Sequence, residues 1–207
     1  MKTFRGPHDP ATPANIAPEV ASLLHEAGNP YFDWFFGDAE RARTVIERWL
    51  LRPDSEVSMQ RVVLLLVDER IAGMFVGLDG AALARCRMAD ALAALREAGR
   101  SPADRALLRT KLAGPQLFAP VSRDEFYLSK LAVVPEMRGR GLGHDLLEAF
   151  LAAGRAAGCR RSRLDVAASN HAAIRLYRSA GFVACEERAK AGLRYVAMAR
   201  DEDARLR

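Results

Sequence analysis

The sequence feature that most constrains the fold is an apolar run that passes directly into a glycine-rich turn, over residues 131–143. The run Leu-Ala-Val-Val is typical of a buried strand and ends at Pro135, which cannot continue a sheet ladder. The turn consists of Arg138, Gly139, Arg140, Gly141, Leu142 and Gly143. Apolar residues at helical spacing follow it, so the sequence predicts a strand, a loop and a helix in immediate succession.

The glycine-rich turn has the properties of an anion-binding loop. Glycines let the backbone approach a ligand closely, and the first N–H groups of the following helix carry the positive end of the helix dipole. Arg138 and Arg140 add full positive charges beside these groups. The glycine spacing fits neither the Walker phosphate loop nor the GxGxxG dinucleotide fingerprint. These residues alone leave two interpretations open, a pyrophosphate-binding loop and a turn without a ligand.

The composition is that of an ordinary globular protein with an excess of basic residues. Half of the residues are hydrophobic and 28% are charged, as in ordinary globular proteins. A chain of 207 residues is long enough to bury one sizeable core. The formal net charge of +5 suits an anionic ligand, yet the arginines are spread along the chain and form no dense basic run. The charge pattern therefore predicts a small phosphorylated ligand and no nucleic acid partner.

Cysteine usage and hydropathy predict a cytoplasmic protein without a metal site. The three cysteines have no CxxC spacing, which indicates neither a disulfide framework nor a zinc site. Residues 1–8 lack the apolar stretch of a secretory signal, and no apolar run reaches the ~18–20 residues that a membrane span needs. We therefore expect a reducing compartment and no membrane association.

The remaining apolar patterns predict helices and strands in a definite order. Before residue 60 they predict a strand at 3–5, a helix at 16–28 and a helix at 38–51 capped by Asp38. After it they predict a hairpin at 61–67 and 71–78, a helical insertion around 81–116, strands at 125–134, 163–166, 182–186 and 193–198, and helices at 144–157 and 170–180. The order βααββ(αα)βαβαββ predicts one mixed α/β domain over residues 1–207, with helices on both faces of a central mixed sheet.

Two segments allow more than one interpretation. The aromatic run at 31–36 either packs a short helix onto the core or supplies rings to a pocket for an acceptor substrate. The helical insertion around 81–116 either shapes a substrate site or decorates the surface. The sequence does not choose between these alternatives.

Two linked motifs make the chain resemble one acyltransferase superfamily. The first is Arg138-x-x-Gly141-x-Gly143 after the run Leu131–Pro135, and the second is Asn170-x-x-Ala173-x-x-x-Tyr177-x-x-x-Gly181-Phe182. In this order and spacing they resemble the coenzyme A motif and a later motif of the GNAT N-acetyltransferase superfamily. The resemblance covers 126–186 closely, and it leaves residues 1–60 and the helical insertion without a specific match.

The resemblance implies that acetyl-CoA is bound mainly through the backbone. In the family, the amides of the glycine-rich loop hold the pyrophosphate, which assigns cofactor contacts to Arg138, Gly139, Arg140, Gly141, Leu142 and Gly143. The backbone equivalent to Leu131, Ala132 and Val133 pairs with the pantetheine arm and polarises the thioester carbonyl, a contact that strengthens as an oxyanion develops. Asn170 resembles a residue that contacts the cofactor near the second motif.

The catalytic candidates are Tyr177 and Glu125. Tyr177 resembles the family's general acid, and a phenol that is protonated at neutral pH can supply a proton to the departing thiolate. Histone acetyltransferases of the superfamily carry a glutamate base at the position of Tyr127, so this chain departs from them there. Strand alternation puts Glu125 on the same face as Tyr127, which makes it the candidate base, while a solvated carboxylate at a strand start stays the alternative.

The resemblance implies an N-acetyltransferase that transfers the acetyl group of acetyl-CoA to an amine by direct attack in a ternary complex, without a metal ion. The acceptor is expected to be a small-molecule or peptide amine, and no motif identifies it. A coenzyme A sensor without turnover is the alternative function. A homodimer is expected only by analogy with such domains, since no segment indicates an interface.

Overall fold

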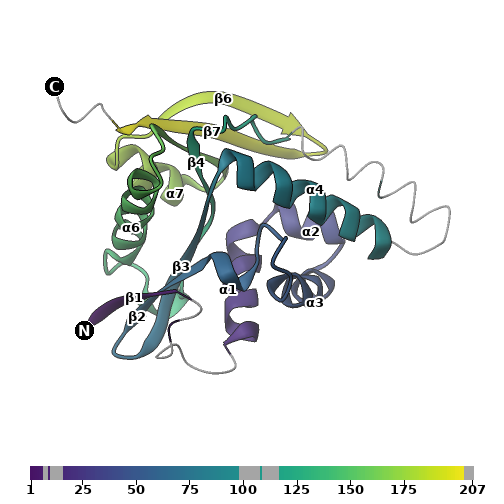
Figure 1. The fold of residues 1–207 in the computed structure, drawn as a ribbon, viewed down its shortest axis with the longest axis horizontal. Helices are drawn as coiled ribbons and strands as arrows, with labels where there is room; N and C mark the ends of the chain where they lie inside the picture. The colour runs from purple at the N-terminus through teal and green to yellow at the C-terminus, as the bar shows by residue number, and fades with distance from the viewer. Residues whose placement is uncertain (7–8, 10–15, 98–107, 109–116, 203–207) are drawn as a thin grey trace.

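A sheet of seven strands runs through the computed structural model, which describes residues 1–6, 9, 16–97, 108 and 117–202 (Figure 1). The strands are β1 (Lys2–Arg5), β2 (Val62–Val67), β3 (Arg70–Asp79), β4 (Glu125–Val133), β5 (Arg161–Ala167), β6 (Val183–Lys190) and β7 (Leu193–Asp201). Their order across the sheet is β1-β2-β3-β4-β5-β7-β6. Neighbouring strands are antiparallel except β4 and β5, which run parallel. The predicted mixed α/β fold is confirmed.

The helices follow the predicted order with one addition. They are α1 (Ala17–Gly28), α2 (Tyr31–Phe36), α3 (Ala39–Leu50), α4 (Gly80–Glu97), α6 (Leu142–Ala156) and α7 (His171–Ser179), with single 3₁₀ turns η1 (Met59–Arg61) and η3 (Pro135–Met137). The short aromatic helix α2 makes three helices between β1 and β2 where the predicted order counted two. The second helix predicted for the insertion lies outside the described residues. None of the described helices is both long and apolar enough to cross a membrane.

Helix α3 forms where local capping and apolar spacing agree. The Asp38 carboxylate accepts a hydrogen bond from the Arg41 backbone N–H at 2.8 Å, which satisfies an otherwise open donor at the start of α3. The buried residues of α3 recur at helical spacing and face the core: Ala42, Val45, Ile46, Trp49 and Leu50. The predicted cap and apolar face of this helix are therefore confirmed.

Helices cover both faces of the sheet, as predicted. Alternate residues of a strand point to opposite faces, so Leu64 and Met74 join one core cluster while Leu65 and Phe75 join another. The first cluster lies under α1, α2, α3 and α4, and the second under α6 and α7. Figure 1 shows α6 and α1 on opposite sides of β3 and β4.

The parallel pair β4 and β5 separates halfway along its length. Backbone pairing between the two strands runs from Glu125 opposite Arg161 to Leu128 opposite Leu164 and ends there. Beyond that point β4 stays paired with β3, and β5 stays paired with β7. The two strands therefore continue into separate halves of the sheet with a gap in the ladder between them.

Candidate functional site

The separation of β4 and β5 opens a cleft of about 290 Å³, which we call the β4–β5 cleft. Half of the residues that the sequence assigned to the cofactor line this cleft, together with the predicted acid: Leu131, Ala132, Val133, Arg138, Asn170 and Tyr177. They come from β4, from the loop after it and from α7. The structure thus brings the two sequence motifs to one place.

The backbone of β4 faces this cleft at two residues. Val134 donates its N–H to the Ala72 carbonyl of β3 at 3.0 Å. Because alternate residues of a strand direct their backbone groups to the same edge, Ala132 also faces β3, while Leu131 and Val133 face the β4–β5 cleft. Leu131 can offer the cleft an N–H and a C=O group that no strand covers, and Val133 can offer its N–H, because its carbonyl accepts a hydrogen bond from Arg138 Nε.

A run of open amides lies at the start of α6. Within the described residues, none of the backbone N–H groups of 139–143 donates a hydrogen bond. Gly139 and Gly141 have φ angles of +76° and +78°, which L side chains resist. These amides and the positive end of the α6 dipole provide the donors and the field that an anion requires.

The two arginines of the loop differ in their contacts. Arg138 donates from Nε to the Val133 carbonyl at 3.1 Å and pairs with Glu26 of α1, which ties the loop to a strand and to a helix. Arg140 is exposed and makes one longer bond, at 3.4 Å, to the Glu136 carbonyl. Arg140 is therefore the more available of the two for a phosphate group.

The last two residues of the loop serve the packing of α6. Leu142 is buried in the core cluster beneath α6 and α7. Gly143 lies against α7, because a Cβ at this position would sit 3.3 Å from the Leu176 side chain. Its glycine permits a close approach of two helices, whereas Gly139 and Gly141 permit an unusual backbone conformation.

Asn170 and Tyr177 belong to the α7 segment. The Asn170 side chain caps this helix by accepting a hydrogen bond from the Ala173 N–H at 3.0 Å. The Tyr177 side chain is buried, and its hydroxyl makes no hydrogen bond within the described residues. Burial raises the pKa of Tyr177 above its usual value, so the phenol keeps its proton at neutral pH. Tyr177 is thus a protonated phenol in the wall of the β4–β5 cleft, and its hydroxyl has no hydrogen-bond partner in the described residues.

A second cavity, of about 130 Å³, adjoins the cleft, and we call it the aromatic cavity. Its aromatic walls are Tyr31, Phe32, Phe35, Phe36, Trp49, Phe118, Tyr127 and Tyr195. The residues that line both spaces are Ala27, Ser129, Lys130, Asp165 and Tyr195. The rings of the aromatic run at 31–36 pack on the core, as one interpretation expected, and some of them also line a cavity. That this cavity receives an acceptor substrate stays a prediction.

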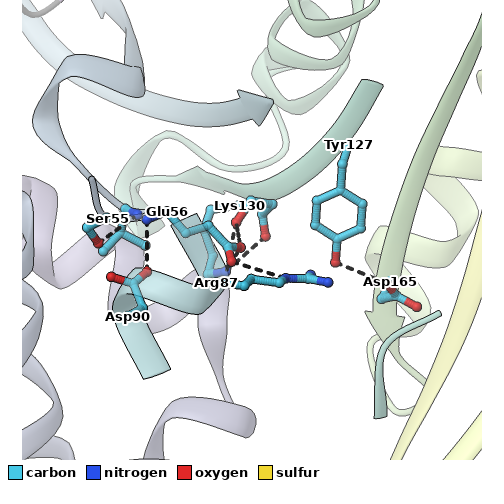
Figure 2. A network of polar contacts seen from close by, with 9 residues as sticks. Ser55, Glu56, Arg87, Asp90, Tyr127, Lys130 and Asp165 are labelled. Atoms are coloured by element: carbon cyan, nitrogen blue, oxygen red, sulfur yellow. Dashed lines mark hydrogen bonds and ion pairs between the residues drawn. The ribbon is translucent and has the colours of Figure 1, made fainter. Parts of the chain in front are cut away.

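Glu56 is the centre of an ion-pair network in the wall of the aromatic cavity (Figure 2). It accepts hydrogen bonds from the Ser129 hydroxyl at 2.5 Å and from Arg87 Nε at 3.3 Å, and Lys130 Nζ lies 3.7 Å away. Burial alone would raise the pKa of Glu56, but the two cations and the Ser129 hydroxyl outweigh burial and lower it. Glu56 is therefore a fixed anion that holds Arg87 and Lys130.

The helical insertion shapes this cavity through α4. Arg87 lies on α4, and its guanidinium stands 4.9 Å from the Tyr127 ring centroid. Asp90, one turn further along, accepts from the Glu56 N–H at 2.8 Å and from Arg52 at 3.2 Å. The described part of the insertion thus supplies the walls of a cavity.

Asp165 of β5 lies where the two spaces meet. The Tyr127 hydroxyl donates to its carboxylate at 3.0 Å, and the Ala119 N–H donates at 3.4 Å. Within the described part of the chain, no cationic nitrogen lies within 4 Å of this carboxylate. Burial raises the pKa of Asp165 above its ordinary value, against these two hydrogen bonds and two more distant arginines. Asp165 is thus a buried carboxylate without a counter-ion.

Glu125 lies at the start of β4, away from this meeting point. Its carboxylate accepts from the Ser122 N–H at 2.7 Å and stands 3.8 Å and 3.9 Å from Arg161 and Arg163. It lines neither the β4–β5 cleft nor the aromatic cavity. Tyr127, two residues along the same face, does line the aromatic cavity. The structure therefore brings Tyr127 to the site and leaves Glu125 at its edge.

Sequence reasoning did not select the polar residues of the aromatic cavity, which are Glu56, Arg87, Asp90, Lys130 and Asp165. They come from a loop, from α4 and from two strands, and no local motif connects them. One signal was available for Asp165, because an acidic residue inside a short apolar strand is costly unless the site uses it.

Solved acetyltransferases share this fold. An N-acetyltransferase from Staphylococcus aureus Mu50 is similar with a TM-score of 0.69 and 17% identity, covering 96% of this chain and 100% of that one. A further acetyltransferase structure has a TM-score of 0.64 and 19% identity, covering 96% and 98%. The ribosomal-protein-S18-alanine N-acetyltransferase from Escherichia coli has a TM-score of 0.54 and 18% identity, covering 97% and 94%. No curated protein sequence matches the chain.

The fold is therefore the one that these solved structures have, and the family is identified from the sequence. The model of the Acetyltransferase (GNAT) family matches residues 23–182, which is more than half of the chain. The chain belongs to this family. The predicted resemblance is confirmed, and the match includes the β4–β5 cleft and the glycine-rich loop.

The network around Glu56 predicts a pH dependence of stability. Burial raises the pKa of Asp90 from its ordinary value of 3.8 to about 6. The folded state therefore binds the Asp90 proton more tightly than the unfolded chain does, and this residue's contribution to stability falls as pH rises from about 4 to 6. Asp90→Asn has no carboxyl to ionise, so it should escape this loss. We expect the free energy of unfolding of the variant minus that of wild type to rise by on the order of 2–3 kcal/mol between about pH 4 and pH 6, and to stay constant above pH 6.

Thermal unfolding of both proteins between pH 4.5 and 7.5 checks this expectation. Asp54→Asn is the matched control, because Asp54 pairs with the same Arg52 at 3.0 Å but is largely exposed. The difference between wild type and Asp54→Asn should stay flat over the same interval. If the difference in free energy of unfolding between Asp90→Asn and wild type is also independent of pH, the raised pKa of Asp90 is contradicted.

Proposed function

We propose that the protein is an N-acetyltransferase that transfers the acetyl group of acetyl-CoA to an amine in a ternary complex. The observation that carries this proposal is the β4–β5 cleft, whose uncovered strand backbone lies close to five open amides at the start of α6. Membership of the GNAT family supports acetyl transfer. The donor, the amine acceptor and a cytoplasmic location are our proposals, and the reaction that we propose needs no metal ion.

In this proposal the donor lies along β4 and ends at α6. The amides of 139–143 bind the pyrophosphate, with Arg140 and Arg138 beside it. Leu131 and Val133 pair their backbone groups with the pantetheine arm, Ala132 supplies a small side chain to the wall, and Asn170 lies near the same arm. Acetyl-CoA fits these residues because uncovered backbone groups of β4 match its pantetheine arm, and the N–H donors of the loop match its pyrophosphate.

The reaction that we propose is a direct attack of the amine on the thioester. The amine nitrogen forms a bond to the carbonyl carbon, the carbon–sulfur bond breaks, and the departing thiolate takes a proton from Tyr177. Overall, the substrate ammonium loses two protons. One restores the hydroxyl of Tyr177, which has protonated the thiolate, and the other is released to solvent. A backbone N–H of β4 stabilises the oxyanion that develops on the carbonyl oxygen.

Two carboxylates are candidates for the general base. Sequence alternation proposed Glu125, whose carboxylate is already bonded to Ser122 and lies near two arginines. Glu125 would have to act through water, because it lines neither space. Asp165 is the better placed carboxylate, since it lines both the β4–β5 cleft and the aromatic cavity.

Donor binding is tested by replacing a glycine of the loop. Gly141→Ala places a side chain on a residue with φ of +78°, which costs roughly 1–2 kcal/mol and displaces the amides. We expect the calorimetric affinity for acetyl-CoA to fall by about tenfold or more. Gly158→Ala is the matched control, because Gly158 has φ of +73° just after the other end of α6 and has open space around it. Equal loss of affinity in both variants, or no heat from wild type, would contradict the assigned loop.

The role of Tyr177 is tested by Tyr177→Phe. Removing the hydroxyl takes away the proposed proton donor and leaves the ring packing intact, so we expect kcat to fall on the order of 100-fold with unchanged acetyl-CoA affinity. Thiol release measures the rate and calorimetry measures the affinity. Unchanged kcat would remove Tyr177 from the mechanism. A wild-type protein that binds acetyl-CoA but turns over no amine would instead favour a sensor of coenzyme A.

A further inference from the structure

The charged groups of the aromatic cavity indicate which kind of amine it accepts. Asp165 is a buried carboxylate without a counter-ion in the described part of the chain, at the point where the cavity meets the β4–β5 cleft. A carboxylate in this position needs a cation, because an unpaired buried charge is costly. The ammonium group of an acceptor supplies that cation next to the place where the thioester is proposed to lie.

Arg87 offers the complementary group. Its Nε is bonded to Glu56 and its side chain also bonds to Tyr127, but its two terminal nitrogens donate to no carboxylate or carbonyl within the described residues. Neither terminal nitrogen is a fully buried polar atom that lacks a hydrogen-bond partner. The guanidinium plane stands against the rings of Tyr127 and Phe118, with its Cζ 4.9 Å and 5.4 Å from the ring centroids. Arg87 therefore presents an oriented guanidinium whose terminal nitrogens have no carboxylate partner in the described residues, and this geometry matches a carboxylate.

Arg87 and Asp165 adjoin the same aromatic ring. The Tyr127 ring lies under the Arg87 guanidinium, and the Tyr127 hydroxyl donates to Asp165 at 3.0 Å. Figure 2 shows the end of the Arg87 side chain directed towards Tyr127 and Asp165. One open cationic group and one open anionic group thus lie close together, as they must to bind an ammonium and a carboxylate of one small molecule.

The charged residues that line the cavity are two cations, Lys130 and Arg87, and three anions, Glu56, Asp165 and Asp90. Asp90 pairs at 3.2 Å with Arg52, which lies outside the lining, so the other four charges balance. Such a cavity does not favour a polycation or a polyanion, but Asp165 and Arg87 together favour a molecule that carries one positive and one negative group. A zwitterion meets this condition.

The rest of the cavity is apolar and small. Rings from α2 and Trp49 of α3 form one side, and the volume is about 130 Å³. Apolar walls with a few convergent polar groups select one compact, largely apolar group and orient it. A side chain of moderate size fits these walls, and a charged or strongly polar one does not.

From these contacts we propose that the acceptor is a free amino acid with an aromatic or aliphatic side chain of moderate size. Its ammonium binds Asp165, its carboxylate binds the terminal nitrogens of Arg87, and its side chain occupies the aromatic cavity. Asp165 then takes the proton that leaves the ammonium before attack, and the neutral nitrogen forms the amide bond as the carbon–sulfur bond breaks. This assignment rests on the proposed acetyl transfer and names the substrate class of the same site.

A set of matched acceptors tests the assignment. With saturating acetyl-CoA, thiol release is measured for L-phenylalanine, L-tryptophan, L-leucine and L-methionine, for the amines that lack their carboxyl groups, and for their amides. We expect kcat/KM for at least one of these amino acids to exceed that of its amine by on the order of 10–100-fold, because only the acid fills the Arg87 fork with a charge-assisted pair. A peptide that begins with the same residue should resemble the amide.

Variants then show whether Arg87 is the cause. Arg87→Met should bring the ratio of amino acid to amine close to one without changing acetyl-CoA affinity, and Arg87→Lys should keep an intermediate ratio. Arg85→Met is the matched control, because Arg85 is an exposed arginine on the same helix. Asp165→Asn should lower kcat/KM for every acceptor and remove the limb of the pH profile that reports a carboxylate base.

Two kinds of failure are distinguishable. If acetyl-CoA binds but amines or peptides are turned over as well as amino acids, or if none of the four amino acids reacts, the inferred acceptor class is wrong and the donor site stands. An unchanged ratio in a folded Arg87→Met protein also overturns the acceptor class. If acetyl-CoA gives neither a thermal shift nor calorimetric heat, the proposed function fails and the acceptor class fails with it.

Discussion

The candidate site depends on backbone hydrogen bonds that β4 and β5 do not make to each other. A buried strand normally pairs its N–H and C=O groups on both edges, because unpaired groups cost free energy. Pairing between these two strands ends at Leu128 and Leu164, while each strand stays paired on its other edge. The sheet thus keeps its overall stability and still leaves a row of free backbone groups facing a cleft.

Two separate cores keep this gap in place. One core packs α1, α2 and α3 against one face of the sheet, and the other packs α6 and α7 against the opposite face. Tyr127 joins the diverging strands through its hydroxyl, which donates to Asp165. Glu56 fixes Arg87 and Lys130 in the adjoining wall. The donor side of the site is therefore built mainly from backbone, and the acceptor side is built from side chains that arrive from distant segments.

This difference explains what the sequence could and could not predict. The strand–loop–helix unit at Gly141 and the cap at Asp38 depend on neighbours in sequence, and both were predictable from local patterns. The acceptor cavity depends on contacts between residues far apart in the chain, such as Ser129 with Glu56, and such pairs have no local signal. Strand alternation correctly put Glu125 and Tyr127 on one face, but it could not tell how far along the face the site lies.

Hydrogen exchange of the backbone amides, with and without saturating acetyl-CoA, tests most directly whether the gap between β4 and β5 is the donor site. We predict that bound acetyl-CoA slows exchange at Leu131, Val133 and the amides of 139–143, which donate to no group in the described free protein. Exchange in β1 and β2, at the far edge of the sheet, should not change. Binding of acetyl-CoA without protection of these amides, or with protection confined to another surface, would contradict the donor site.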